Sequence, residues 1–582
     1  MRANRASFSK ERAQLVMRSQ RGQSSGVAST LVKPSAAVEI ADTQEARKAR
    51  GAFFTPTAIA RFITEWAVQS SGDRVMEPSC GDAEFLVEAV SRLRALGAKK
   101  PVVDGVEIHE GSAAVARERV VQAGGIPKIS TSDFFLVDPA PTYSAVIGNP
   151  PFMRYQDFAG EARSRSRSAA LRAGVPLSGL ASSWAAFTIH SALFLAPNGR
   201  MGLVLPAELL SVNYAAVVRQ FLFENFRSVD LVVFNERVFP EAEVDIVLLL
   251  ADGYTSGPTD HATIYQAGNA DDLATTIPAQ RWIPANPAAK WTQSLLSSAS
   301  LTAYSAVLQG DGFTNLETWG DTTLGMVSGN NKYFALSDER VASLGLEPSD
   351  LIVLSPPGSS HLRGLELSAR NLRSLGASGS ARWLFRPGVK PSPSALEYIS
   401  AGEKAGVDQA YKCRVRKPWW RVPLVKPADL LLTYMNADTP RLTTNSAHAH
   451  HLNSVHGVYL RPEFSDLGRE LLPVASLNSM TMLGAETVGR AYGGGILKIE
   501  PKEADVLPVP SPALVKRAAA SLRAIRPRIA RLLREGRLLD AAMLVDGVLL
   551  MKELGMTEEQ VATLRSARAD LVSRRVTRSL HG

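Results

Sequence analysis

The sequence predicts an α/β protein whose largest part is a doubly wound, mostly parallel sheet of seven strands within residues 48–255. Short apolar runs alternate there with amphipathic stretches, and this alternation is typical of strands covered by helices. After Glu77, for example, Phe85, Ala89 and Leu93 share one face at helical spacing. The expected strands are DRVMEP (73–78), VVDGVEI (102–108), PKISTSD (127–133), YSAVIGN (143–149), RMGLVLP (200–206), VDLVVFN (229–235) and VDIVLLL (244–250).

The rest of the chain divides by composition. Residues 1–47 are rich in Arg, Ser and Gln without an apolar period, which predicts a basic flexible tail; a mitochondrial transit peptide has a similar composition. Residues 256–320 are rich in turn-forming residues and predict a linker or insert. Residues 321–510, with basic residues among aromatics, predict a mixed α+β domain, and residues 511–582 predict a basic helical C-terminal segment.

Bulk composition limits the classes of function. A chain of 582 residues is too long for one compact core. Two cysteines, Cys80 and Cys413, exclude a disulfide scaffold and favour a reducing compartment such as the cytoplasm. No apolar run approaches the roughly 18 residues of a membrane span, and no signal-peptide pattern is present. The net charge of +9 favours a polyanionic partner.

Four expected strands end in residues that could bind a ligand. Glu77 ends the first, Glu107 the second, Asp133 with Phe134 the third, and Asn149 begins the NPPF segment after the fourth. In open parallel sheets, ligands bind outside the carboxyl ends of the strands. The sequence therefore predicts a largely acidic binding edge.

The loop after the first strand limits the choice of cofactor. It lacks G-x-G-x-x-G and G-x-x-x-x-G-K-[ST], so a dinucleotide or nucleoside triphosphate is poorly provided for. A carboxylate after the second strand is the usual partner of ribose hydroxyls. S-adenosyl-L-methionine, a nucleoside that carries an amino acid and a positive charge, suits this acidic edge.

Five ordered motifs resemble those of the γ-class (TaqI-like) adenine-N6 DNA methyltransferases of restriction-modification systems. They are GAFFTP (51–56), VMEPSCGDAEFL (75–86), GVEIHE (105–110), TSDFF (131–135) and IGNPPF (147–152). The resemblance covers about residues 50–250 and, more loosely, the region after 321. It implies a Rossmann-like class I methyltransferase domain, S-adenosylmethionine as cofactor, double-stranded DNA as substrate, and a bacterial cytoplasmic location. A separately encoded restriction endonuclease acting on the same site is left open as a partner.

The resemblance also implies roles for residues around the cofactor. Thr55 and Pro56 close over its methionine end, Glu77 lies near its amino group, Gly81 forms the turn of the first loop, Glu107 holds the ribose, and Asp133 with Phe134 brackets the adenine ring. One departure is Ala83, which stands where many relatives have a second glycine. If that position requires a positive φ, alanine is strained there.

The NPPF segment has a chemical rationale in amino-group methylation. The amino nitrogen of adenine is a poor nucleophile because its lone pair is delocalised into the ring. The side-chain oxygen of Asn149 and the carbonyl of Pro150 could accept its two hydrogens and localise that pair, while Pro151 stiffens the loop and Phe152 stacks on the base. No catalytic cysteine is needed, and Cys80 reads as a small buried side chain beside the cofactor.

An adenine inside a duplex has to be flipped out to reach such a pocket. That requirement predicts a second aromatic side chain that packs against the flipped base, and Phe239 is the candidate. An equally good interpretation is that Phe239 is a core residue at the start of a strand.

The region after residue 321 is expected to recognise the DNA sequence. Segments 327–334, 411–423 and 477–501 resemble parts of related target-recognition domains. In the second segment, basic and aromatic residues that fit phosphate contacts and stacking are Arg414, Arg416, Lys417, Trp419, Trp420 and Arg421. Such tryptophans can also merely anchor a packed loop.

Other interpretations are weaker. His448, His450, His451 and His456 lack a recognised ligand spacing, so we expect no metal site there. An RNA adenine or protein-glutamine methyltransferase could use the same fold, and a catalytically silent DNA-recognition subunit is a further alternative. The intact NPPF segment argues against the silent subunit, and the large basic C-terminal half argues against the protein-glutamine enzyme.

Overall fold

The computed structural model describes residues 55–153, 160–234, 236, 238, 245–275, 279–284, 286–492 and 494–577. The predicted basic tail, residues 1–47, lies outside these ranges. Among the described helices, none is long and apolar enough to cross a lipid bilayer.

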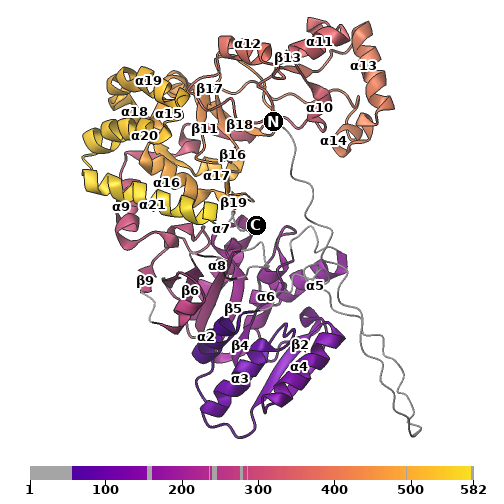
Figure 1. The fold of residues 1–582 in the computed structure, drawn as a ribbon, viewed down its shortest axis with the longest axis vertical. Coiled ribbons are helices and arrows are strands. Elements are labelled where there is room, and N and C mark those ends of the chain that lie inside the picture. The colour runs from indigo at the N-terminus through magenta and orange to yellow at the C-terminus, as the bar shows by residue number, and fades with distance from the viewer. Residues whose placement is uncertain are drawn as a thin grey trace, which may run out of the picture. The chain divides into compact units, whose positions relative to one another are not determined.

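A nine-stranded mixed sheet forms the centre of the first domain (Figure 1). Each of the seven predicted segments contributes one of its strands. Pairing is parallel from β3 to β5, and β7 runs antiparallel between β5 and β6. In spatial order the strands are β3 (Ile126–Thr131), β2 (Val102–Glu107), β1 (Val75–Glu77), β4 (Tyr143–Gly148), β5 (Leu195–Pro206), β7 (Ile246–Tyr254), β6 (Phe226–Phe234), β8 (Ala262–Ala267) and β9 (Ala279–Trp282).

The last two strands correct the prediction of a seven-stranded sheet followed by a linker. Strands β8 and β9 lie within residues 256–320; β8 pairs parallel with β6, and β9 pairs antiparallel with β8. Ala262 and Ile264 of β8 are fully buried. The stretch ATIYQA carries only this short alternation between polar loops, which is why its composition suggested a linker.

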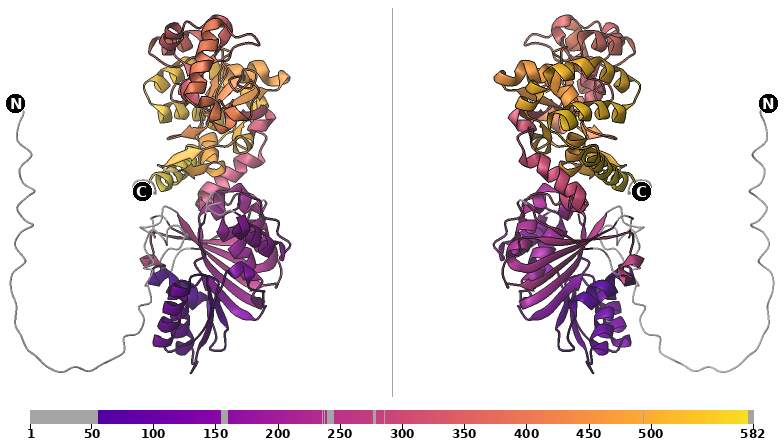
Figure 2. Two further views of the ribbon diagram at one scale, coloured as in Figure 1. Left: turned by 90° about the vertical axis from the view of Figure 1, so that its right-hand side faces the viewer. Right: turned by 90° about the vertical axis from the view of Figure 1, so that its left-hand side faces the viewer.

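Helices cover both faces of the sheet, as Figure 2 shows. Helices α2 (Thr57–Ala67), α3 (Glu84–Ala95) and α4 (Glu110–Gln122) pack on one face, and α5 (Gly160–Leu171), α6 (Ser183–Ala192) and α8 (Ala216–Asn225) pack on the other. Strand residues alternate between the two cores: Val146 joins one, while Ala145 and Ile147 join the other. Two further helices are α7 (Glu208–Ser211) and α9 (Ser298–Gln309).

The region after residue 310 combines small sheets with helices, in agreement with the predicted α+β composition. Its sheets, in spatial order, are β10 (Phe313–Asn315) with β21 (Pro508–Pro510); β11 (Gly320–Leu324), β18 (Val455–Leu460), β15 (Leu430–Thr433) and β17 (Leu442–Thr444); β12 (Ala335–Leu336), β14 (Trp383–Phe385) and β13 (Leu351–Val353); and β16 (Met435–Asn436), β20 (Ile496–Lys498) and β19 (Arg490–Tyr492). Its helices before residue 511 are α10 (Asn331–Phe334), α11 (Asp338–Leu344), α12 (Ala369–Ala377), α13 (Pro393–Lys404), α14 (Tyr411–Arg414), α15 (Ser465–Ala475), α16 (Ser479–Val488) and α17 (Pro501–Asp505).

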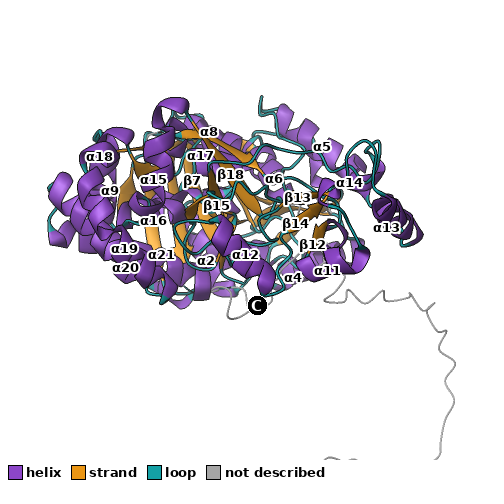
Figure 3. Cartoon of the chain, turned by 90° about the horizontal axis from the view of Figure 1, so that it is seen from above, coloured by secondary structure: helices purple, strands orange, loops and turns teal. Residues whose placement is uncertain are grey.

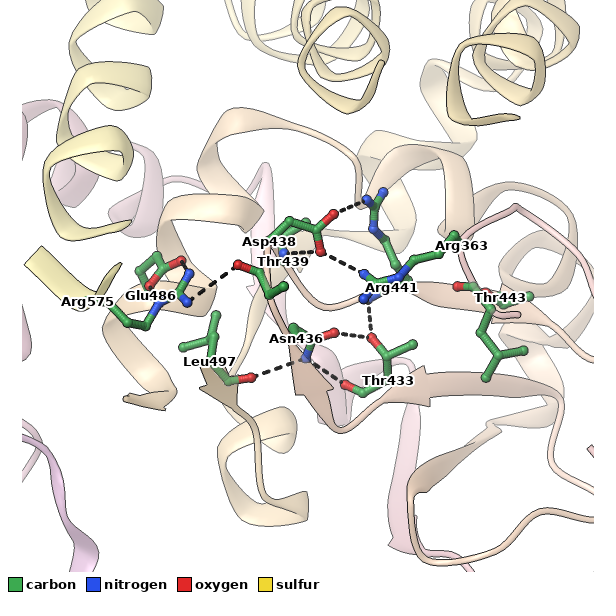
Figure 4. Close-up of polar contacts among 12 residues, drawn as sticks. Arg363, Thr433, Asn436, Asp438, Thr439, Arg441, Thr443, Glu486, Leu497 and Arg575 are labelled. Carbon is green, nitrogen blue, oxygen red and sulfur yellow. Dashed lines mark hydrogen bonds and ion pairs between the residues drawn. The ribbon is translucent and has the colours of Figure 1, made fainter. Parts of the chain in front are cut away.

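The C-terminal segment is helical, as predicted, and packs into the core of the preceding region. Its helices are α18 (Pro512–Arg517), α19 (Ala519–Arg534), α20 (Leu538–Asp546) and α21 (Glu558–Thr577), with a π-helical turn at Gly547–Glu553. They share one apolar core with α15 and α16 (Figure 3). On α21, Arg575 is 4% exposed and donates to both carboxylate oxygens of Glu486 on α16, at 2.9 and 3.1 Å (Figure 4). Part of the basic character of this segment is therefore internal.

Candidate active site

The chain order of the large sheet reverses between β1 and β4, so the loops that follow these two strands adjoin. Open α/β sheets bind ligands at such a point. Gly148 ends β4 with a φ of +155°, and a Cβ added to it would lie 3.2 Å from Cγ of Glu77. Glycine at this position therefore lets the NPPF loop begin directly against Glu77.

Glu77 is a buried carboxylate at the end of β1. Its side chain is 3% exposed, and within the described chain its Oε2 atom has no hydrogen-bond partner. Burial raises the pKa of Glu77 well above its ordinary value, and the nearby carboxylates of Asp82 and Glu107 raise it further. Among the residues that the structure describes, this side chain therefore lacks a cationic partner, which a ligand ammonium group could supply.

Glu107 links the loops that follow β1 and β2. One carboxylate oxygen accepts the backbone N–H of Gly81, and the other accepts that of His109, both at 2.9 Å. Because an ionised carboxylate can accept about four hydrogen bonds, these contacts fix the side chain and leave capacity for ligand hydroxyls.

The first loop has the positive φ angles that the glycine pattern suggested. Gly81 has a φ of +49°, and Ala83 adopts the left-handed conformation with φ +69° and ψ +32°. The conditional prediction of strain at Ala83 is confirmed, since an L-residue pays a cost of about 1–2 kcal/mol in this region.

Asp133 and Phe134 lie at the end of β3, in different environments. Asp133 accepts the N–H of Phe135 at 3.0 Å and contacts the guanidinium of Arg165 on α5 at 3.4 Å. The Phe134 ring is 3% exposed and packs against Phe187, with ring centroids 5.4 Å apart. Its predicted contact with the cofactor adenine stays a prediction.

The NPPF loop contacts the segment before α2. The Asn149 amide nitrogen donates to the Thr55 hydroxyl oxygen at 3.2 Å, while Pro56 caps the start of α2. Pro150 is buried, Pro151 is half-buried, and the half-buried Phe152 packs against the cores on both faces of the sheet. The structure thus brings Thr55 to the NPPF loop, a pairing that two motifs 94 residues apart did not reveal.

Two further residues concern the base pocket and the NPPF loop. Phe239, the candidate second wall of the base pocket, lies outside the described residues. Ser183 was missed: this first residue of α6 hydrogen-bonds the NPPF loop, and its only sequence signal is a serine pair, SSW, before an apolar helix.

Two members of the predicted DNA-binding segment anchor the segment itself. Arg416 donates to the carbonyl of Val327 at 2.6 Å, and burial lowers its pKa. Trp419 donates to Glu403 at 3.0 Å and lies 5.6 Å from the ring of Tyr333. The loop-anchoring interpretation therefore describes these two side chains better than direct DNA contact.

The other members differ in exposure. Arg414 and Lys417 are exposed, whereas Trp420 and Arg421 are half-buried. Cys413 beside them is fully buried, and burial raises the pKa of its thiol. Arg414 and Lys417 are thus the members best placed to reach phosphates in solution.

Of the four histidines considered for a metal site, His448 is exposed, whereas the other three contact backbone or lie in the core. His450 and His456 contact the carbonyls of Val425 and Ile499, each at 2.8 Å. Burial lowers the pKa of His451 to about 4, which keeps its ring neutral at physiological pH.

The hydrogen-bond acceptors at the switch point, where the chain order reverses between β1 and β4, fit S-adenosylmethionine, the cofactor expected from the sequence. A ligand ammonium group would pair with the buried Oε2 atom of Glu77, which has no hydrogen-bond partner within the described chain. Ribose hydroxyls would use the remaining acceptor capacity of Glu107. Cys80 between them is 3% exposed, and burial raises the pKa of its thiol, so it is an inert neighbour of the site.

Two protein families match successive parts of the chain. The N-6 DNA Methylase family matches residues 40–280, and the C-terminal domain of the type II methyltransferase M.Eco57I matches residues 288–550. The first range contains the switch-point site, and the second contains the region predicted to recognise DNA.

Individual proteins show the same likeness. The type II methyltransferase M.XamI from Xanthomonas campestris pv. amaranthicola is 27% identical over 79% of this chain and 85% of that protein. M.AccI from Acinetobacter calcoaceticus is 22% identical over the same shares. A DNA complex of the type IIL restriction-modification enzyme MmeI superposes with a TM-score of 0.53 at 12% identity, covering 88% of this chain and 75% of that one, which shows a shared fold.

Proposed function

We propose that this chain, which belongs to the N-6 DNA methylases, transfers a methyl group from S-adenosylmethionine to the N6 amino group of adenine at a specific site in double-stranded DNA. It is a methyltransferase of the restriction-modification type. The observation that carries the proposal is the meeting of the buried Glu77 carboxylate and the Asn149–Phe152 loop at the switch point of the sheet. The order of the sequence motifs supports the γ class for this methyltransferase.

The cofactor supplies an electrophilic methyl group on a sulfonium. Glu77 pairs with its ammonium, Glu107 accepts hydrogen bonds from the ribose hydroxyls, and Asp133 with Phe134 borders its adenine. Thr55 and the NPPF loop close the methionine end. The reacting groups are thereby oriented, and in-line methyl transfer needs proximity and orientation rather than a covalent nucleophile.

Asn149 and Pro150 activate the target amino group. The amide nitrogen of Asn149 donates to Thr55, and the proposal assigns the amide oxygen to the substrate. That oxygen and the Pro150 carbonyl accept hydrogen bonds from the two hydrogens of the adenine amino group, so that the nitrogen lone pair is localised for attack on the methyl carbon. As the N–C bond forms, the bond between that carbon and sulfur breaks, and the methylated amino group then loses one proton. Phe152 stacks on the flipped base.

The region after residue 321 supplies DNA recognition. Arg414 and Lys417, exposed on segment 411–423, contact phosphates, and the proposal assigns Arg416 and Trp419 to holding that segment in place. With chromosomal DNA as substrate, the protein works in the bacterial cytoplasm, with or without a separately encoded restriction endonuclease of the same specificity.

Single-molecule sequencing of DNA from cells that express the full chain tests the function. We expect N6-methyladenine at one recurrent sequence, absent from cells that express Asn149→Ala. Unmodified DNA, together with methylated RNA or methylated glutamine in the same cells, would replace the proposal with one of the alternative substrates.

A further inference from the structure

Ser183 holds the NPPF loop from the opposite side of the site to Thr55. Its hydroxyl donates to the carbonyl of Pro151 and accepts the N–H of Met153 at 2.9 Å. Its own backbone N–H donates to the Met153 carbonyl at 3.1 Å. The side chain is 1% exposed, so these bonds are shielded from water.

The two prolines limit how the loop backbone can be held. Pro150 and Pro151 carry no N–H and cannot donate to a ladder of backbone hydrogen bonds. Met153, two residues after the proline pair, supplies the backbone N–H that Ser183 accepts. A single side chain therefore binds backbone groups on both sides of Phe152, the carbonyl of Pro151 and the N–H of Met153.

Helix α6, which carries Ser183, is itself anchored at its first turn. Trp184 is fully buried, and its indole N–H donates to the hydroxyl of Tyr214 at 3.0 Å. That hydroxyl donates to Glu208 at 2.6 Å, two residues beyond the end of β5. Burial and Glu208 raise the pKa of Tyr214, so its hydroxyl stays protonated and remains a donor. Ser183 is thus a fixed support rather than a mobile side chain.

We propose that Ser183 is a positioning residue for methyl transfer: by fixing the backbone on the far side of the two prolines, it aims the Asn149 oxygen and the Pro150 carbonyl at the target amino group. This inference rests on the proposed function. A shift of about 1 Å in such acceptors is enough to cost about a hundredfold in rate.

The test compares Ser183→Ala with Ser191→Ala in the full-length protein. Ser191 lies on the same helix, is also 1% exposed, and its hydroxyl has no partner among the described residues, so it controls for loss of a buried serine. Single-turnover methylation is measured on unmethylated plasmid DNA that carries the site found by sequencing. S-adenosylmethionine affinity is measured by calorimetry, and the thermal midpoint is measured on the same samples.

We expect Ser183→Ala to lower the rate of methyl transfer by about 10- to 100-fold, as for two lost hydrogen bonds, with cofactor affinity within about twofold. Ser183→Cys, whose slightly larger thiol is a weak donor and acceptor, should fall between wild type and alanine. Equal rates for the Ser183→Ala and Ser191→Ala variants overturn the inference, as does a parallel loss of cofactor affinity and stability. A wild-type protein that methylates no DNA instead overturns the proposed function.

Discussion

Replacing Glu77 with glutamine should stabilise the protein without cofactor and weaken cofactor binding. The side chain is 3% exposed, and its Oε2 atom lacks a partner within the described chain. Burial raises the pKa of Glu77 above its ordinary value of 4.5. The folded protein therefore keeps the proton at pH values where the unfolded chain has lost it, so stability falls as the pH rises through that range and stays low above it.

The expected size follows from this environment. Glutamine keeps the shape of the side chain and has no proton to lose, so the gain in Tm over wild type should grow as the pH rises above about 4.5. Because glutamine also leaves a buried polar group without a partner, the gain comes only from the ionisation that the carboxyl undergoes and the amide does not. It is about 1.4 kcal/mol, or roughly 3–6 °C for a domain of this size, for each pH unit between the pKa values of the unfolded and folded states. Loss of the carboxylate that pairs with the ligand ammonium should weaken S-adenosylmethionine binding by about a hundredfold or more.

Differential scanning calorimetry at pH 5 and pH 8, together with titration calorimetry of the cofactor, measures both effects. Glu84→Gln is the control, because Glu84 accepts hydrogen bonds from Thr57 and Arg119, each at 2.6 Å. That variant should lose stability at pH 8. A lower Tm for Glu77→Gln at pH 8, or unchanged cofactor affinity, would refute the assignment of Glu77.

Three further predictions concern the catalytic loop, the ribose partner and the DNA contacts. Asn149→Ala should reduce single-turnover methylation by about two orders of magnitude with nearly unchanged cofactor affinity, and near-normal turnover would contradict the role of the amide. Glu107→Ala should weaken cofactor binding measured by calorimetry and leave DNA binding, measured without cofactor, unchanged. The reverse pattern would show that another residue binds the ribose. Replacing Arg414 and Lys417 together should reduce the slope of log affinity against log salt by about 2, because fewer counterions are released, whereas Arg416→Ala should mainly lower the Tm. An unchanged slope for the double variant would exclude phosphate contacts there.

Periodicity sufficed to identify the inner strands because they are buried on both faces: β4, β5 and β7 consist mostly of buried residues. The seven predicted segments contain seven strands of one sheet, although β3 at one edge buries only Ile129. Strands β8 and β9 escaped because both alternate only briefly, and β9 (Ala279–Trp282), at the other edge, buries a single residue, Trp282. Sheet edges are where an apolar pattern carries the least information.

Site residues could be predicted where a motif lies at a strand end, and could not where partners meet only in three dimensions. Glu77, Glu107 and Asn149 follow strands of the sheet, so topology alone places them at one edge. The contact of Thr55 with Asn149 and the support from Ser183 depend on how α2 and α6 pack, which no local pattern specifies. In segment 411–423, sequence alone could not separate side chains that anchor the loop from side chains that face solvent.

The distribution of charge along the chain matches the opposite charges of its two proposed ligands, the cationic cofactor and the anionic DNA. A cationic cofactor favours an edge lined by carboxylates, and the charges of Asp82 and Glu107 raise the pKa of Glu77 beyond the effect of its burial. The same potential repels DNA phosphates, so the binding energy for the duplex cannot come from that edge. Exposed cations outside the edge, such as Arg414 and Lys417, can supply it. A single surface would have to be negative for the cofactor and positive for DNA. Cations on the separate region after residue 310 remove the need for one surface to meet both requirements.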